Sequence, residues 1–388
     1  MKSLLKIFGV AVLAATVGFG FVGCGDGGGG PVDVYRPGFV DPTVERQPLT
    51  WQSVDAPLFT SPQEADRIWA VAAGTSSFVA VGGWGPNDTI AAGFSFDALT
   101  WENSAGNFRS ELRTVAFGNG VFIAADVGTF HDQDVDNFEA AAMYVSTDGG
   151  RTFAGPILTG ADVTGGNFTG ESGLRSVISI TYGGGRWLAV GLDGQMIYST
   201  NNGSSWSRVF QNVADRLLPP GDNSAIRDAI FADGRWIVAG DRGMTAWSDN
   251  FTTWNTVTVP GFLEVQGFQR LIYFDGYVLA VGSGGNMWRS PDKGESWDEI
   301  ERGAHGFGVH DIYGLAFGNG SFVIVGAGGR IRSVNWNSPL FEDGIWSHWH
   351  TRANSAGDTQ ALYAVAYGGG LWVVGGRSGE MFVSSVGD

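Results

Sequence analysis

The stretch AFGNGVFIAAD, residues 116–126, decides the fold because close copies of it recur along the chain. Each copy places a turn of Gly, Asn or Asp between the end of one apolar run and a second run rich in β-branched and aromatic residues. The other copies are TYGGGRWLAVG (181–191), FADGRWIVAGD (231–241), YFDGYVLAVGS (273–283), AFGNGSFVIVG (316–326), AYGGGLWVVGG (366–376) and the weaker VAAGTSSFVAVGG (71–83). Asn-Gly and Asp-Gly supply the positive φ angles that tight hairpin turns require, so every copy predicts a β-hairpin.

The spacing of these hairpins indicates a β-propeller. Most copies follow one another at roughly 40 to 50 residues, the length of a four-stranded propeller blade. One interval of about 65 residues contains two insertions, 128–142 and 155–173. The 62 glycines and the 13% aromatic residues also favour short strands with tight turns over helices. We therefore predict an all-β fold, a single seven-bladed β-propeller over residues 49–388.

A second motif follows the hairpin in most units. STDGGRTF (146–153), STNNGSSW (199–206) and SPDKGESW (290–297) share the pattern S-x-[DN]-x-G-x-x-[WF], and SFDALTW (95–101) and SDNFTTW (248–254) are shortened copies. These segments resemble the Asp box, or BNR repeat, of sialidase-like propellers. The resemblance implies that they are turns that mark the fold, on the face of the propeller away from any binding site.

The two ends of the chain predict how the ring closes. The last unit ends at MFVSSVGD, before any Trp-bearing outer strand, and the missing piece occurs near the start as PLTWQSVDAP, around Trp51. We expect this N-terminal strand to complete the last blade, because closure removes the exposed edges of an open sheet.

The first residues predict export. Residues 1–23 have a short basic start and an apolar run from about residue 8 to residue 22, which is typical of a signal peptide. The final FVGC resembles the lipobox of bacterial lipoproteins, which implies lipidation of Cys24; an ordinary cleaved signal with a chance cysteine is the alternative. Residues 24–48 read as a glycine-rich tether. Gly25 follows the cysteine in place of an Asp, which favours the outer membrane if the source is Gram-negative.

Composition and motifs exclude several classes of partner. The net charge is −16, so we expect no nucleic acid partner and no membrane contact except through the lipid on Cys24. No nucleotide-binding loop occurs, and the acidic loop around Asp134 lacks the glycine and the glutamate of a calcium loop. We therefore expect no cofactor, no metal and a monomeric body.

The repeat register predicts one constellation. In a propeller, the innermost strand of each blade begins at the mouth of the central channel, on the face that carries the long between-blade loops. The residues at that start are Trp69, Arg113, Arg175, Arg227, Gln269, Tyr313 and Tyr363, with Arg175 placed approximately because its unit carries two extra residues. Arginine forks bind carboxylate or phosphate, and aromatic faces stack on sugars or cations. The alternative is structural: these arginines pair with neighbours such as Asp66, Asp228 and Asp311 and fasten adjacent blades.

Three functions follow from this sequence. The leading hypothesis is a non-catalytic, lipid-anchored module that binds an envelope protein or glycan, with an anionic group, on its long-loop face. The second is a carbohydrate-active enzyme, which resembles sialidases or xyloglucan-cleaving propellers. Against it, sialidases have six blades and an [FY]RIP motif that is missing here, and no carboxylate pair can be assigned. The third is an assembly factor of a membrane complex, since the photosystem II assembly factors are similar seven-bladed propellers.

Overall fold

The computed structural model describes residues 49–55, 58, 66–83, 90–130, 138–139, 141–158, 176–192, 194–210, 217, 224–262, 266–300, 307–335, 350–351 and 360–385. The predicted signal peptide, the predicted tether and Arg175 lie outside these residues.

Seven sheets carry the fold, and each contains one of the predicted hairpins. Blade 1 contains β2 (Arg67–Ala73), β3 (Phe78–Gly83), β4 (Ile90–Ser95) and β5 (Glu102–Asn103). Blade 2 contains β6 (Ala105–Gly106), β7 (Leu112–Gly118), β8 (Val121–Asp126), β11 (Ala142–Ser146) and β12 (Thr152–Leu158). Its insertion forms a separate pair, β9 (Thr129–Phe130) and β10 (Phe138–Glu139).

The remaining blades follow the same order from the innermost to the outermost strand. Blade 3 contains β13 (Val177–Gly183), β14 (Arg186–Gly191), β15 (Met196–Ser199) and β16 (Ser207–Arg208). Blade 4 contains β17 (Ile226–Ala232), β18 (Arg235–Gly240), β19 (Met244–Ser248) and β20 (Asn255–Thr258). Blade 5 contains β21 (Phe268–Phe274), β22 (Tyr277–Gly282), β23 (Met287–Ser290) and β24 (Asp298–Ile300).

Blades 6 and 7 complete the series. Blade 6 contains β25 (Ile312–Gly318), β26 (Ser321–Gly326), β27 (Arg330–Asn335) and β28 (His350–Thr351). Blade 7 contains β29 (Leu362–Gly368), β30 (Leu371–Gly376), β31 (Met381–Ser385) and β1 (Gln52–Val54). Two short 3-10 turns, Ser283–Gly285 and Ala327–Gly329, follow β22 and β26. Among the described residues, no helix is long and apolar enough to cross a membrane.

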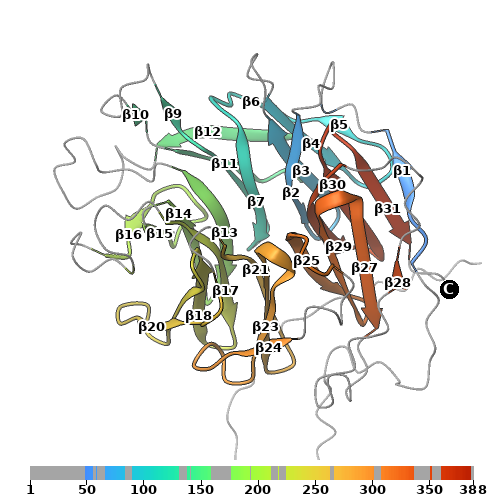
Figure 1. Ribbon diagram of the computed structural model, residues 1–388. Helices are drawn as coiled ribbons and strands as arrows, with labels where there is room; N and C mark the ends of the chain where they lie inside the picture. Colours follow the sequence, from blue (N-terminus) through green and yellow to red (C-terminus); the bar gives the residue numbers. More distant parts are fainter. Residues whose placement is uncertain are drawn as a thin grey trace, which may run out of the picture. The chain divides into compact units, whose positions relative to one another are not determined.

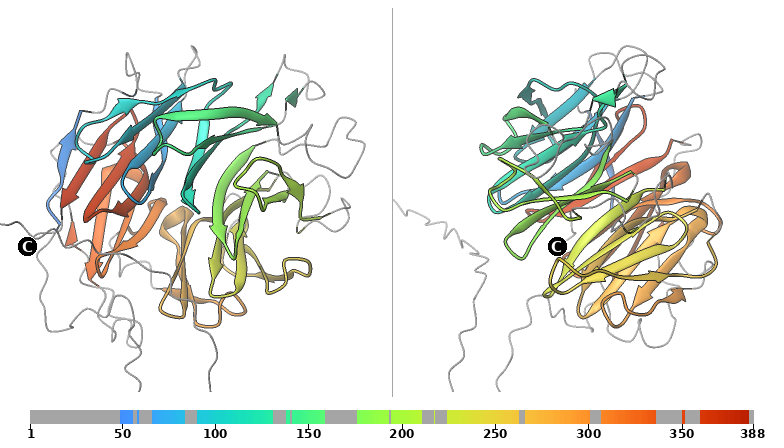
Figure 2. Two further views of the ribbon diagram at one scale, coloured as in Figure 1. Left: turned by 180° about the vertical axis from the view of Figure 1, so that it is seen from behind. Right: turned by 90° about the vertical axis from the view of Figure 1, so that its left-hand side faces the viewer.

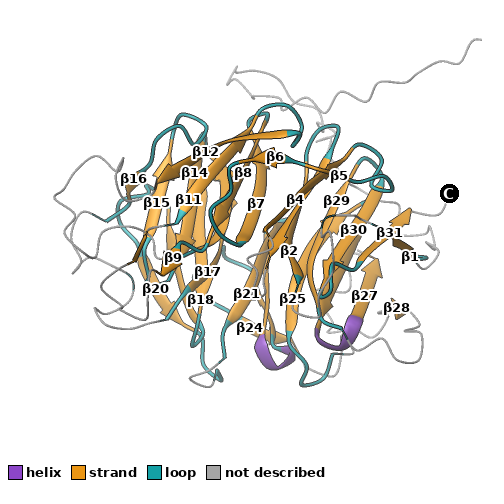
Figure 3. Ribbon diagram, turned by 90° about the horizontal axis from the view of Figure 1, so that it is seen from above, coloured by secondary structure: helices purple, strands orange, loops and turns teal. Residues whose placement is uncertain are grey.

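The seven innermost strands form a closed ring around a central axis (Figure 1). Each contacts the innermost strand of the blade before it and of the blade after it, and β2 contacts β29. The views from behind and from above show the same succession of blades (Figures 2 and 3). The predicted all-β, seven-bladed propeller is therefore confirmed.

The N-terminal strand closes the ring, as the sequence predicts. β1 pairs antiparallel with β31, with Gln52 opposite Val383 and Val54 opposite Met381. Beside it, Trp51 packs against the apolar cluster shared by blades 6 and 7. The last blade thus takes its outer strand from the start of the described chain, which leaves no unpaired blade in the ring.

The apolar core lies between neighbouring blades. Leu188 and Val190 of blade 3, for example, pack against Ile226 and Val238 of blade 4, and all four are fully buried. The β-branched residues of each second strand therefore contribute to faces that adjacent blades cover. This explains why several copies of the repeat are needed before any one is stable.

The hairpin turns and the S-x-[DN] turns lie at the end of each blade opposite the channel mouth. In blade 2, Gly118 pairs with Val121 at one end while Leu112 pairs with Asp126 at the other. Asn119 and Gly120, between them, have φ angles of 47° and 80°, which is the left-handed geometry predicted for the Asn-Gly turn. The Asn119 side chain donates a 2.9 Å hydrogen bond to Asn202, in the S-x-[DN] turn of blade 3.

Each S-x-[DN] turn is closed by its own side chains. The Ser146 hydroxyl donates to Asp148 and accepts the Gly150 N–H, and Asp148 accepts both the backbone and the hydroxyl of Thr152. Asn201 and Asn250 accept equivalent hydrogen bonds in their own turns. Phe153 and Trp206, which end two of these motifs, are buried. The predicted structural role of STDGGRTF agrees with this geometry.

Two glycines with the same backbone angle provide a matched test of this packing. Gly150 and Gly234 both have a φ of 94°, but a Cβ at Gly150 would overlap the Val79 methyl of blade 1, whereas nothing lies within 4 Å of a Cβ at Gly234. Left-handed strain costs about 1–2 kcal/mol in either Ala variant. We expect Gly150→Ala to lose about 1–3 kcal/mol more in urea unfolding, because the blade interface must shift. Equal losses in the two variants would contradict this packing.

The aspartates of these turns make the free energy of unfolding depend on pH. For Asp97, the Thr100 N–H is the main cause of a pKa below the ordinary 3.8; for Asp148 and Asp292, burial raises the pKa, but hydrogen bonds led by Thr152 and Ser296 outweigh it. A lowered folded pKa gives stability that is present above the unfolded pKa and is lost as pH falls through the folded value.

We therefore expect the midpoint of urea unfolding to fall less between pH 5 and pH 2 in the triple variant Asp97→Asn, Asp148→Asn, Asp292→Asn than in the wild type. The Asn residues at positions 201 and 250 show that the turn accepts this residue. Identical pH profiles for the two proteins would refute the assignment.

Candidate functional site

A β-bulge near the start of each innermost strand builds the candidate site. In all seven blades the pairing with the second strand shifts by one residue near the start of the innermost strand, after its second residue in blade 1 and after its first residue in the other six. The residues at the shift, here called the mouth ring, are Trp69, Arg113, Ile178, Arg227, Gln269, Tyr313 and Tyr363. A bulge re-aims a side chain out of the sheet, and here it turns one side chain per blade toward the channel mouth.

Six members of the mouth ring are residues that the sequence predicts for this position. In blade 3 the register places Ile178 there, directly after the fully buried Val177, whereas the predicted Arg175 lies outside the described residues. All seven innermost strands contain seven residues, so counting back from the hairpin glycine Gly183 leads to Val177.

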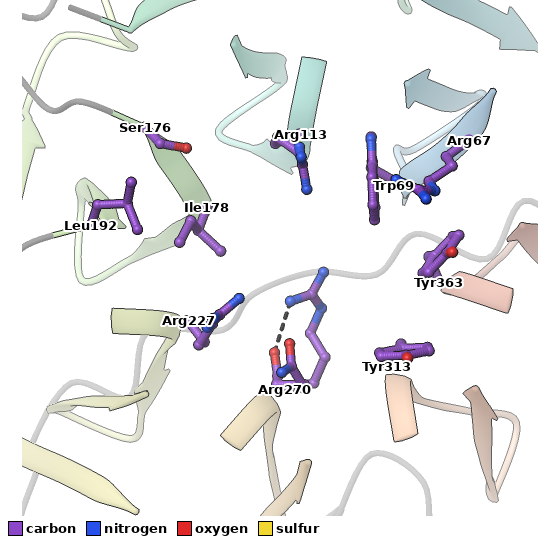
Figure 4. Close-up of a pocket in the computed structure, with 11 residues that line it drawn as sticks. Arg67, Trp69, Arg113, Ser176, Ile178, Leu192, Arg227, Arg270, Tyr313 and Tyr363 are labelled. Carbon is purple, nitrogen blue, oxygen red and sulfur yellow. Dashed lines mark hydrogen bonds between the residues drawn. The ribbon is translucent and has the colours of Figure 1, made fainter. Parts of the chain in front are cut away.

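The mouth ring surrounds one cavity of about 490 Å³ (Figure 4). All seven ring residues line it, together with Arg67, Ser176, Leu192 and Arg270. These lining residues include four arginines and no Asp or Glu. The volume lies in the range of pockets that hold a small ligand or one or two residues of a partner.

One wall of the cavity combines arginines with aromatic rings. Trp69 lies between Arg113 and Arg67, whose guanidinium carbons are 4.0 Å and 4.9 Å from its ring centre (Figure 4). Tyr363 continues the wall with its ring centre 4.7 Å from that of Trp69, and Tyr313 follows at 5.3 Å from Tyr363. Cation–π attraction holds the two guanidinium groups in place, so this wall presents fixed positive charge.

Acidic side chains stand behind the arginines. Arg113 forms an ion pair with Glu111 in the segment that leads into the same strand. Burial raises the pKa of Glu111, while Arg113 opposes this effect. Burial also lowers the pKa of Arg113; Glu111 opposes that shift, and the like charges of Arg67 and Arg227 add to it. The guanidinium groups are thus close enough to repel one another, and an anion in the cavity would relieve that repulsion.

Arg227 is held by a two-point fork. Its Nε donates to Asp241 Oδ1 at 2.8 Å, and its Nη2 donates to Asp241 Oδ2 at 3.3 Å. Asp241 belongs to the same blade, so this pair orients the guanidinium and does not fasten two blades. The structural alternative named Asp66, Asp228 and Asp311 as partners, but Asp311 accepts hydrogen bonds from the Tyr313 hydroxyl and the Gly284 N–H.

Asp228 is a carboxylate that joins three blades. It is buried, and it accepts the Ser179 hydroxyl of blade 3 at 2.6 Å and the Leu271 N–H of blade 5 at 2.7 Å. Burial raises its pKa, and the nearby charge of Arg270 opposes the shift. Asp228 therefore ties three consecutive blades together, next in sequence to the cavity residue Arg227.

Arg270 reaches toward the middle of the cavity (Figure 4). Its Nη1 donates a 2.8 Å hydrogen bond to the carbonyl of Gln269. It occupies the position directly after the mouth ring, where blades 1, 2, 3, 6 and 7 have small residues: Ala70, Thr114, Ser179, Gly314 and Ala364. Asp228 stands at this position in blade 4, so the two charged exceptions occur in neighbouring blades. A charged residue where most blades have a small one is the sequence signal that could have identified Arg270.

The remaining wall is apolar. Ile178 and Leu192 of blade 3 lie across the cavity from Trp69 and Arg67 (Figure 4). Leu192 is fixed by its backbone, which donates to the Ser176 carbonyl and bridges to Ala225 of blade 4. The cavity therefore has a cationic and aromatic side and an aliphatic side. Among the described residues, no cluster of His, Cys, Asp and Glu could hold a metal ion, and Asp132, Asp134 and Asp136 lie outside them.

Comparison with known proteins supports the fold. Neither a protein-family model nor a curated protein matches the chain. Among solved structures, the chain is similar to “YCF48 bound to D1 peptide”, with a TM-score of 0.60 and 14% identity over 89% of this chain and 99% of that chain. It is also similar to “YCF48 from Cyanidioschyzon merolae”, with a TM-score of 0.56 and 15% identity over 86% of this chain and 98% of that chain.

A third similar structure is the “WD40 beta propeller domain of Doa1”, with a TM-score of 0.58 and 13% identity over 88% of this chain and 98% of that chain. At such low identity the likeness concerns the fold alone. The chain is a seven-bladed β-propeller with an arginine-lined cavity at the mouth of its channel.

Proposed function

We propose that this chain is a lipid-anchored propeller of the cell envelope that acts as a non-catalytic binding module. It holds a protein partner by inserting an anionic group of that partner into the cavity at the channel mouth. The observation that carries the proposal is the lining of this cavity, in which the residues that the structure describes include four arginines and no acidic residue. Acidic residues outside the lining hold two of these guanidinium groups in a fixed orientation. A fixed guanidinium group is suited to bind a carboxylate through two parallel hydrogen bonds.

A protein partner fits this cavity better than a glycan. Sugar rings stack on the faces of aromatic side chains. Arg113 and Arg67 flank the ring of Trp69, and Tyr363 lies between Trp69 and Tyr313. These contacts use the aromatic faces to hold arginines and other rings. The likeness to a propeller described with a bound peptide also favours a protein segment as the ligand.

The second candidate, a glycoside hydrolase, receives less support. Most such enzymes need two carboxyl groups that flank the scissile bond. Among the described acids beside the lining residues, Glu111, Asp228 and Asp241 are engaged with arginines or backbone groups, and Asp311 accepts from the Tyr313 hydroxyl. The third candidate, an assembly factor, is a special case of protein binding and would be recognised by the identity of the partner.

The envelope location is proposed from the sequence of residues 1–48. The apolar run, the FVGC stretch that resembles a lipobox and the glycine-rich segment after it suggest an exported body on a lipid anchor. We also propose that the S-x-[DN] turns are Asp boxes like those of sialidase-like propellers, because the Ser hydroxyl donates to the Asp or Asn two residues on in three of them.

The anchor can be tested by metabolic labelling. Cells that express the full chain and receive an alkyne fatty acid should label the wild type and not the Cys24→Ala variant, because Cys24 is the only cysteine of the chain. The wild type should also fractionate with membranes and the variant with the soluble envelope fraction. Equal labelling of both proteins, or an unlabelled wild type, would refute the lipid anchor.

The binding role can be tested by crosslinking in the native host. A tagged full chain should capture a discrete envelope protein, and Arg270→Gln should reduce that capture by about tenfold or more because a charged contact is lost. Arg270→Lys should restore it only in part, since Lys keeps the charge but not the fork.

The matched control for this experiment is Arg186→Gln, which removes an exposed arginine at the opposite end of blade 3. Arg270→Gln should lower the melting temperature because it removes the charge that offsets the burial of Asp228, so capture is compared at a temperature at which both variants are folded. Capture that is unchanged by Arg270→Gln, or lost equally with Arg186→Gln, would contradict binding at the channel mouth.

A further inference from the structure

The two sides of the cavity differ in chemistry, and this difference defines the ligand more closely. We propose that the cavity selects a carboxylate that has an aliphatic side chain directly beside it, presented by a peptide. This inference rests on the proposed function, since it assumes a protein ligand. It adds a second requirement, an aliphatic side chain next to the carboxylate, which positive charge alone does not impose.

The cationic side fixes where the carboxylate lies. Arg113 and Arg227 come from the mouth ring, and each is oriented by its own acid, Glu111 and Asp241. Arg270 extends toward the middle of the cavity between them (Figure 4). Fixed guanidinium groups that point at one volume bind a small planar anion with little loss of side-chain freedom.

The aliphatic side fixes what accompanies the carboxylate. Ile178 is the only aliphatic member of the mouth ring, and Leu192 lies beside it. Both side chains are partly exposed toward the cavity, so a ligand would cover them. Covering apolar surface stabilises a complex in proportion to the area removed from water.

The size of the cavity limits the ligand to a short segment. About 490 Å³ accommodates one or two residues and not a folded element. Gln269 and Ser176, which also line the cavity, supply the amide and hydroxyl groups that can bond to a peptide backbone. Two kinds of peptide carry the required chemistry: an Asp or Glu followed by an aliphatic residue, and a free C-terminus on an aliphatic residue.

The test is a fluorescence anisotropy titration of the detergent-solubilised full chain with labelled peptides. The side-chain probe is the end-blocked peptide Gly-Ser-Glu-Leu-Ser-Gly, and its controls replace Glu by Gln or Leu by Ser. The terminal probe is Gly-Ser-Gly-Ser-Leu with a free carboxylate. Its controls are the same peptide with a C-terminal amide, and Gly-Ser-Gly-Ser-Ser, which lacks the aliphatic residue. We expect at least one probe to bind about tenfold more tightly than each of its controls, and the arm that does so identifies the source of the carboxylate.

Variants separate the two requirements. Ile178→Thr, which keeps a β-branched residue in the strand, should reduce the preference for Leu over Ser to about twofold or less and leave the carboxylate preference unchanged. Arg270→Gln should have the reverse effect, and Arg186→Gln should change neither.

The outcomes distinguish this inference from the proposed function. Tight binding of carboxylate peptides without any preference for Leu would overturn the aliphatic requirement and leave the binding module intact. Peptides that do not bind at all, in a protein that captures its partner through Arg270, would overturn the inference alone. Peptides that bind equally well to Arg270→Gln would overturn both.

Discussion

The β-bulge at the start of each innermost strand is the constraint on which the site depends. An innermost strand without the shift would keep this side chain in the regular alternation of the sheet, beside residues such as Val177 that are fully buried between blades. The bulge instead turns one side chain per blade into the channel mouth. Ring closure by β1 and β31 then brings the seven side chains to a single cavity, although they are spread over about 300 residues.

Positive charge at the mouth is tolerated because the acidic residues lie behind it. The chain is strongly acidic overall, yet the lining residues that the structure describes include arginines and no carboxylate. Glu111 and Asp241 hold Arg113 and Arg227, and the charge of Arg270 favours the ionised form of the buried Asp228. Such an arrangement prepares the site before a ligand arrives, so little reorganisation is needed on binding. Asp228 has a second role, because its hydrogen bonds to Ser179 and Leu271 keep three blades in register.

Much of the fold follows from local sequence rules, whereas the site depends on register and on contacts between blades. The turn at Asn119 and the pairing of β1 with β31 follow from residue chemistry and from counting repeats. The arginine partners do not. Arg227 pairs with Asp241 and not with its neighbour Asp228, whose buried carboxylate is bonded to Ser179 and Leu271 of the adjacent blades. Arg270 escapes a search confined to the mouth ring because it lies one residue beyond it.

The central claim, that the mouth cavity binds a carboxylate beside an aliphatic group, is tested most directly by a crystal structure with a bound peptide. The Glu-Leu peptide described above is a suitable ligand. We expect its carboxylate within hydrogen-bonding distance of Arg270 and of a second arginine of the cavity, with the Leu side chain against Ile178 and Leu192. A peptide bound elsewhere on the propeller, with the cavity empty, would contradict the account.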